Sequence, residues 1–244
     1  QDPQFSQYMF ARLPVNPAYA GSNEAICASL LYRNQWTGFG GEPKTSLFAF
    51  DMPVEALHGG IGLSFYASDR LGAQSNMNVR GAYAYRTELG SGHIAIGVDA
   101  GYQQQSINGG DLVFNDLNDN LIPSGKVGGG TFDMSAGAYY NSDKLYIGIA
   151  STHLTGGNIN YDNVRTSLAR HYWVMAGYSA ELSPSLTLKP SLVAKSDAVS
   201  TQIVLNANLF INNRFWVGGG YRYQDAVVLM AGLELIPNLK LGYS

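Results

Sequence analysis

The sequence predicts an all-β fold, namely a transmembrane antiparallel up-and-down β-barrel. Three observations support this: long stretches of strict alternation, very little charge, and connections that alternate between tight and long. Of the 244 residues, 45% are hydrophobic and only 14% are charged, whereas soluble domains carry about 25% charged residues. No run of about 18 consecutive apolar residues is present, so spanning helices do not explain the low charge. The other spanning structure is a closed β-barrel, whose apolar residues occupy alternate positions.

The alternation places apolar and polar side chains on opposite faces of each segment. In residues 94–103, Ile96 and Val98 share one face, while Gly97 and Asp99 share the other. Residues 202–211 repeat the pattern, with Asn206 on the polar face. Each face keeps its character over about ten residues, the length that a tilted strand needs to cross a bilayer. We therefore expect Asp99 and Asn206 to point away from lipid.

About twelve complete strands and one partial strand are expected in this chain. They begin near Ile26, Thr45, Gly60, Asn76, His93, Phe132, Leu145, Ala169, Ser185, Thr201, Phe215, Val227 and, for the partial strand, Leu239. Single-chain bacterial barrels have even strand numbers. We therefore expect about 14 strands in the full protein, with the C-terminal strands missing from this chain.

Connection length gives an independent indication, because outer-membrane barrels alternate short periplasmic turns with longer outer loops. Every second connection is tight and rich in turn-forming residues. The connections between them include the long stretches 108–131 and 155–165. We expect the tight set to be periplasmic and the long set to lie outside the cell.

The chain divides into a non-strand segment, residues 1–22, and the barrel, residues 23–244. The first segment does not alternate and contains three prolines, which disfavour a wall strand. Its aromatic side chains would be a liability if exposed, so we expect it to pack inside the barrel as a plug or against a periplasmic partner. The candidate partner-binding residues are Phe5, Tyr8, Phe10 and Tyr19 in this segment and Asp111, Phe114 and Asn118 in the long outer loop.

Aromatic and basic residues near the strands have expected positions as well. Tryptophans prefer the membrane boundary, so Trp36, Trp173 and Trp216 are expected in the aromatic girdles. An arginine facing the lipid at mid-bilayer would cost roughly 2 to 4 kcal/mol. The strand arginines are therefore expected to face the lumen or an interface; they are Arg80, Arg86, Arg170 and Arg222.

The sequence gives little indication of catalysis, cofactor binding or metal binding. The four histidines show no helical zinc spacing. Asp116, Asn118 and Asp119 have oxygen ligands of the calcium-binding kind, but the glycine and glutamate of an EF-hand loop are absent. The glycines at 128–130 lack a phosphate-loop lysine and are interpreted as flexible backbone. We expect no enzyme activity, no cofactor and no metal.

Charge and cysteine content exclude further classes. The formal net charge is -3 and the 15 basic residues form no cluster, so nucleic acid is not an expected partner. Cys27 is the single cysteine, so neither an internal disulfide nor a paired-cysteine redox motif can form.

Several motifs carry a resemblance to a known family. Residues 1–10 read QDPQFSQYMF and residues 16–21 read NPAYAG. This opening resembles the start of the PorP/SprF family of type IX secretion membrane proteins. Later matches are YRNQW at 32–36, GGIGL at 59–63, THLT at 152–155, RHY at 170–172 and LKPSL at 188–192. The resemblance covers essentially the whole chain.

The resemblance implies a bacterial outer-membrane accessory of the type IX secretion and gliding machinery. Its implied partners are a secreted surface adhesin, bound through the adhesin's C-terminal domain, and periplasmic peptidoglycan-binding or secretion lipoproteins. The family implies no catalytic residues. Two alternatives remain open: an outer-membrane channel or small-molecule uptake porin, and a soluble all-β binding protein.

Overall fold

The computed structural model describes residues 4–38, 42–70, 74–111, 125–161 and 164–244. Within these residues there are sixteen strands and four short 3-10 helices. The strands are β1 (Cys27–Asn34), β2 (Lys44–Val54), β3 (Gly59–Arg70), β4 (Gln74–Leu89), β5 (Gly92–Asn108), β6 (Lys126–Ser142), β7 (Leu145–Thr152), β8 (Asn158–Tyr161), β9 (Val164–Ser167), β10 (His171–Tyr178), β11 (Ala180–Ser183), β12 (Leu186–Ser196), β13 (Thr201–Ile211), β14 (Phe215–Arg222), β15 (Ala226–Ile236) and β16 (Leu239–Tyr243). The helices are η1 (Tyr8–Phe10), η2 (Pro17–Tyr19), η3 (Glu55–Leu57) and η4 (Gly109–Asp111).

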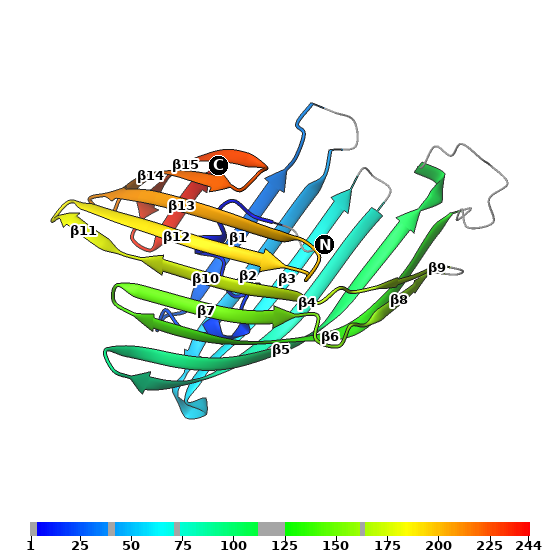
Figure 1. Ribbon diagram of the computed structural model, residues 1–244, viewed down its shortest axis with the longest axis horizontal. Helices are drawn as coiled ribbons and strands as arrows, with labels where there is room; N and C mark the ends of the chain where they lie inside the picture. Colours follow the sequence, from blue (N-terminus) through cyan, green and yellow to red (C-terminus); the bar gives the residue numbers. More distant parts are fainter. Residues whose placement is uncertain (1–3, 39–41, 71–73, 112–124, 162–163) are drawn as a thin grey trace.

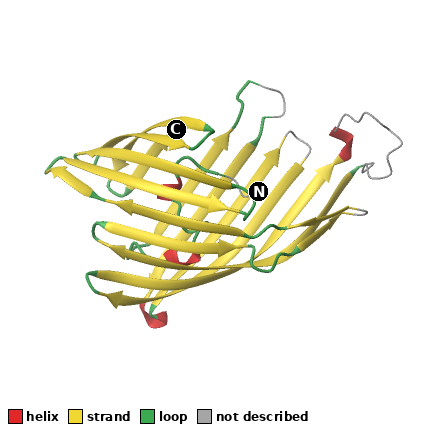
Figure 2. Ribbon diagram, in the orientation of Figure 1, coloured by secondary structure: helices red, strands yellow, loops and turns green. Residues whose placement is uncertain are grey.

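Fourteen of the strands form one antiparallel sheet, in which most strands pair with the strands before and after them in the sequence. Strand β7 pairs with β10, β11 adds to β12, and β8 pairs only with β9. The sheet curls into a trough, and the blue N-terminal residues lie on its concave side (Figure 1). Strands dominate the chain (Figure 2). The all-β antiparallel prediction is confirmed; among the described strands, β1 and β16 are the two edges and do not pair with each other.

The two faces of the sheet follow the predicted alternation. Asp99 and Asn206 are 5% and 4% exposed on the concave face, as predicted. The convex face carries apolar side chains that the strand register aligns in a row across five strands. This row consists of Phe48, Phe65, Val79, Tyr102 and Phe132, all exposed to the surroundings. A continuous apolar surface of this extent is typical of lipid contact.

Two tryptophans occupy a different face from the one predicted. Trp173 and Trp216 are 7% and 3% exposed and point to the concave side, whereas Trp36 is exposed. Trp173 alternates in phase with the buried Met175, so its inward direction follows from strand periodicity. The girdle interpretation was wrong for these two residues because it used position along the strand without its phase.

Two predicted loops contain strand structure. Residues 128–130 belong to β6, where they pair with residues 104–106 of β5, so the prediction of flexible backbone there was wrong. A run of glycines has no side-chain alternation, and this removed the signal for a strand. The connection 155–165 contains β8 and the beginning of β9, a hairpin that packs on β6. Strands of four residues are too short for a clear period.

Successive connections lie alternately at the two ends of the sheet, as the antiparallel strand order requires. The turns at 90–91, 143–144 and 237–238 lie at one end of the sheet, and the long connections follow the opposite strand ends. That second end also has short connections, at 197–200 and 223–225. Length therefore separates the two ends less strictly than the sequence suggested.

Candidate functional site

The candidate site is the concave face of the sheet together with residues 4–22, called here the N-terminal segment. Within the segment, Ala18 and Ala20 are fully buried and Leu13 is 3% exposed. The helix η2 contacts β4, β5 and β6. Pro17 occupies the first turn of η2 and Asn16 caps it, which is the usual place for these residue types. The segment is therefore ordered against the sheet.

Glycines on the concave face allow the segment to approach the strands closely. A Cβ atom on Gly97 would lie 2.4 Å from the backbone nitrogen of Ala18, and one on Gly60 would lie 2.4 Å from the carbonyl oxygen of Ala20. Gly137 would meet the side chain of Asn16 at 2.2 Å. No side chain fits at these three positions without moving the segment. Gly60, Gly97 and Gly137, called here the glycine seat, therefore allow residues 16–20 to pack directly on the strands.

Asn16 joins the segment to the sheet by hydrogen bonds. Its side-chain amide donates to the carbonyl oxygens of Ala138 on β6 and Ile149 on β7, at 3.0 and 3.2 Å. Its Oδ1 accepts from the backbone N–H of Ala18 at 3.0 Å. The residue is completely buried, so these partners replace water that it would otherwise bind.

Arg12 lies among tyrosines on the same face. Its guanidinium donates to the hydroxyl of Tyr139 at 2.9 Å and sits 3.7 Å from the centre of the Tyr146 ring. Tyr19 packs edge-on against Tyr139 with ring centroids 5.5 Å apart. The aromatic faces provide cation–π contacts that partly replace the hydration of the guanidinium.

The first part of the segment contacts the edge strand β1 and, across the concave face, strands β13 and β14. On β1, Arg33 donates to the carbonyl of Gln4 at 2.6 Å and Ser29 donates to that of Phe10 at 2.9 Å. On the far side, the Phe10 ring lies 5.1 Å from that of Trp216 on β14, and Asn206 of β13 donates to the carbonyl of Ser6 at 3.2 Å. Residues 4–10 thus connect β1 with β13 and β14 from inside.

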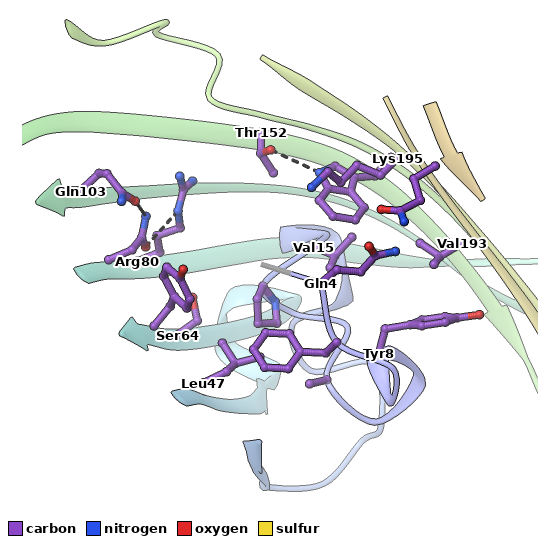
Figure 3. A pocket seen from close by; sticks show the side chains of 17 residues that line it. Gln4, Tyr8, Val15, Leu47, Ser64, Arg80, Gln103, Thr152, Val193 and Lys195 are labelled. Atoms are coloured by element: carbon purple, nitrogen blue, oxygen red, sulfur yellow. Dashed lines mark hydrogen bonds between the residues drawn. The ribbon is translucent and has the colours of Figure 1, made fainter. Parts of the chain in front are cut away.

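A small cavity lies between the segment and the sheet. The cavity there has a volume of about 90 Å³ and is lined by both elements, among them Tyr8 and Val15 of the segment and Leu47 of β2 (Figure 3). Ligand sites usually have volumes of about 300 to 1,000 Å³. The cavity is too small for such a ligand, and the segment itself is the main occupant of this part of the concave face.

A buried charge cluster lies beside this cavity. Arg80 of β4 forms ion pairs with Asp99 of β5, at 2.8 Å, and with Asp133 of β6. Asp133 also contacts the Nδ1 atom of His153 at 2.6 Å and accepts from the Thr155 hydroxyl at 2.9 Å. His153 and Thr155 begin the connection that leads to β8. The cluster therefore ties three wall strands to the base of the β8–β9 hairpin.

The predicted arginine positions can be compared with this geometry. Arg80 and Arg222 are both 7% exposed on the concave face, as expected. Arg86 bonds to Glu24 at 3.1 Å, and Arg170 lies before β10, where it donates to the carbonyl of Leu154 at 2.8 Å. Sequence reasoning placed Arg80 and Asp99 on the same side but missed their pairing, which depends on the register between β4 and β5.

The predicted partner-binding residues fall into three groups. Tyr8 and Tyr19 are buried against the sheet, and Phe5 and Phe10 are half-buried in the same segment. Asp111 ends η4, which directly follows β5. Phe114 and Asn118 lie outside the described residues. The structure therefore brings the first four together and leaves their binding to a partner as a prediction.

Among the described residues, no group of three or more histidine, cysteine, aspartate or glutamate side chains is arranged to hold a metal ion. In the same part of the chain, no helix is long and apolar enough to cross a membrane.

Comparison with known proteins identifies the family. No curated protein matches the chain. The family model described as type IX secretion system membrane protein PorP/SprF matches residues 1–244, the whole chain. The earlier resemblance is thereby confirmed, and the all-β fold agrees with it. The chain belongs to the PorP/SprF family and is a membrane component of the type IX secretion system.

Proposed function

We propose that the protein resides in the bacterial outer membrane and serves there as a docking scaffold of the type IX secretion system. Its outer end binds a secreted surface protein, an adhesin, and anchors it or assists its export. Its inner end contacts periplasmic secretion or peptidoglycan-binding lipoproteins. No chemical reaction is part of this role.

The packing of the N-terminal segment is the observation that supports this proposal most directly. The segment packs on the concave face beside a cavity of only about 90 Å³ and connects β1 with β13 and β14. A diffusion channel needs an open lumen, whereas a scaffold needs a wall that keeps its shape under load. An inner segment that connects the edge strand β1 with β13 and β14 favours the scaffold over the porin.

The outer end offers a fixed surface for a partner. Strands β4, β5 and β6 are 16 and 17 residues long, whereas a tilted strand crosses the bilayer in about 9 to 11 residues. Their outer ends therefore project beyond the membrane, where the β8–β9 hairpin packs on β6. The charge cluster at the base of the hairpin holds this surface in place.

Affinity purification from native membranes tests the proposal. The tagged full-length protein should recover a secreted protein and at least one type IX secretion component, identified by mass spectrometry. Charge reversal at Arg165 and Thr166→Glu, both on the exposed outer hairpin, should reduce recovery of the secreted protein and leave periplasmic components unchanged. Recovery of the barrel alone would contradict the proposal.

A further inference from the structure

The convex face changes from apolar to polar over a short distance toward the outer end. Register aligns Lys44, Asp69, Ser75 and Ser106 in one row across β2 to β5. Each lies four residues beyond a member of the apolar row on the same strand and on the same face. Four residues correspond to roughly 13 Å along a strand. The polar row therefore marks the level at which the hydrocarbon layer ends.

A groove lies at this level. It has a volume of about 470 Å³, within the range of ligand sites and several times that of the cavity beneath the N-terminal segment. Its lining residues come mostly from the convex face: Lys44, Ser46, Ala67, Ser68, Asp69, Ser75, Asn76, Met77, Gln104, Ser106 and Lys126. The groove is thus open to the surroundings just above the apolar row.

The lining mixes hydrogen-bond donors and acceptors. Lys44 and Lys126 supply ammonium groups from β2 and β6, the two outer strands of the groove. Asp69 supplies a carboxylate, and the serines and Gln104 both donate and accept. Lys44 also pairs with Glu42 at 3.3 Å, so the two lysines are balanced by Glu42 and Asp69 and these four groups carry no net charge. A bare phosphate would leave the acceptors unused, whereas a phosphorylated sugar offers hydroxyls to the acceptors and phosphate to the lysines.

We propose that this groove binds the phosphorylated sugar headgroup of a glycolipid in the outer leaflet. The acyl chains then lie against the apolar row below, beside Phe48, Phe65 and Val79. The inference rests on the orientation in the proposed function, which places this end of the sheet at the outer leaflet. It does not require any protein partner. The bound lipid fixes the height of the barrel in the membrane and thus the height of the outer hairpin.

Native mass spectrometry of the full-length protein provides the test. The protein is incubated in detergent with lipid A, an acylated and diphosphorylated disaccharide, or with phosphatidylglycerol at equal concentration. The variant Lys44→Gln/Lys126→Gln removes both ammonium groups from the groove. The matched control Lys144→Gln/Arg214→Gln removes two exposed positive charges in turns at the opposite end of the sheet.

The expected result is a lipid A adduct on the wild-type protein that exceeds the phosphatidylglycerol adduct. The groove variant should lose about tenfold in lipid A affinity, because each lysine near the headgroups contributes to anion binding, while the control should keep its affinity. Equal retention of the two lipids, equal loss in both variants, or no adduct overturns the inference. Lipid adducts are measured without a protein partner. A failure to bind lipid A therefore counts against this inference alone, whereas a failure to recover the secreted protein in the affinity purification counts against the proposed function.

Discussion

The side-chain amide of Asn16 donates to the carbonyl oxygen of Ala138 at 3.0 Å, inside a fully buried contact between the N-terminal segment and β6. These two residues are 122 positions apart in the sequence. The complete set of bonds requires β6 and β7 to lie side by side, because the same amide also bonds to Ile149. We infer that the segment docks onto a sheet that has already formed, and that its loss leaves the strands in place.

The glycine seat can be tested by adding a single methyl group. Gly97→Ala should displace the N-terminal segment, because the new Cβ would lie 2.4 Å from the nitrogen of Ala18. Limited proteolysis should then cleave within residues 4–22 much faster than in the wild-type protein. Gly81→Ala is the matched control, since a Cβ there meets no atom within 4 Å. If residues 4–22 were cleaved equally slowly in the two variants, the proposed packing of the segment on Gly97 would be contradicted.

The hydrogen bonds of Asn16 should contribute measurably to stability. Asn16→Ala leaves the carbonyls of Ala138 and Ile149 without this donor, at a cost of about 1 to 3 kcal/mol. Urea unfolding in detergent, followed by tryptophan fluorescence, measures the change. The exposed Asn158 on β8 gives a control, because Asn158→Ala should change the free energy of unfolding by less than about 0.5 kcal/mol. Indistinguishable variants would argue against the contact.

The charge cluster predicts a larger effect from a single truncation. Arg80→Ala leaves the buried carboxylates of Asp99 and Asp133 without their cation, and removing one partner of a buried ion pair typically costs about 3 to 5 kcal/mol. Adding Asp133→Asn to this variant should restore part of the loss. Gel electrophoresis of samples heated to increasing temperatures measures both effects, as the temperature at which the band of the unfolded protein appears. Arg170→Ala, at an exposed position, serves as the control and should leave the transition unchanged.

The turn between β12 and β13 should resist acid. Hydrogen bonds from the backbone N–H groups of Ser200 and Val199 lower the pKa of Asp197 to about 2. A depressed carboxyl pKa stabilises the turn above the ordinary value of about 3.9, and the contribution disappears as pH falls through the folded value. The NMR amide shifts of Val199 and Ser200 should therefore stay constant until pH falls well below 3.9. A midpoint at the ordinary value would contradict this.

Strand positions were predictable because one face of the sheet is apolar and the other is polar. Side chains along a strand point to the two faces in turn, so the sequence of a strand alternates with a period of two residues. Residues 94–103 show this period without interruption, and the exposure of β5 alternates from Ala95 to Gln104. The same period would have assigned Trp173 and Trp216 to the concave face had their phase been followed. The β8–β9 hairpin and residues 128–130 gave no such signal, because four-residue strands and glycines carry too few side chains to show a face.

The candidate site was less predictable than the fold. The aromatic residues of the N-terminal segment indicated burial, but their seat depends on glycines from β3, β5 and β6 that only the register brings together. The pairing of Arg80 with Asp99 and Asp133 depends on register in the same way. Aligning the inward positions across the 90–91 turn could have found the pairing of Arg80 with Asp99, since this two-residue turn fixes the register of β4 and β5. The glycines and Asp133 lie on strands that no tight turn joins to each other, so their positions could not be aligned in this way.

Ion conductance in planar bilayers tests the central claim most directly, namely that the N-terminal segment occupies the interior. The full-length protein should pass little current, and Gly97→Ala should pass more, because the displaced segment opens the concave face to water. The Gly81→Ala control should behave like the wild-type protein. A large, stable current through the wild-type protein that the Gly97 variant does not increase would contradict the account and favour a diffusion channel.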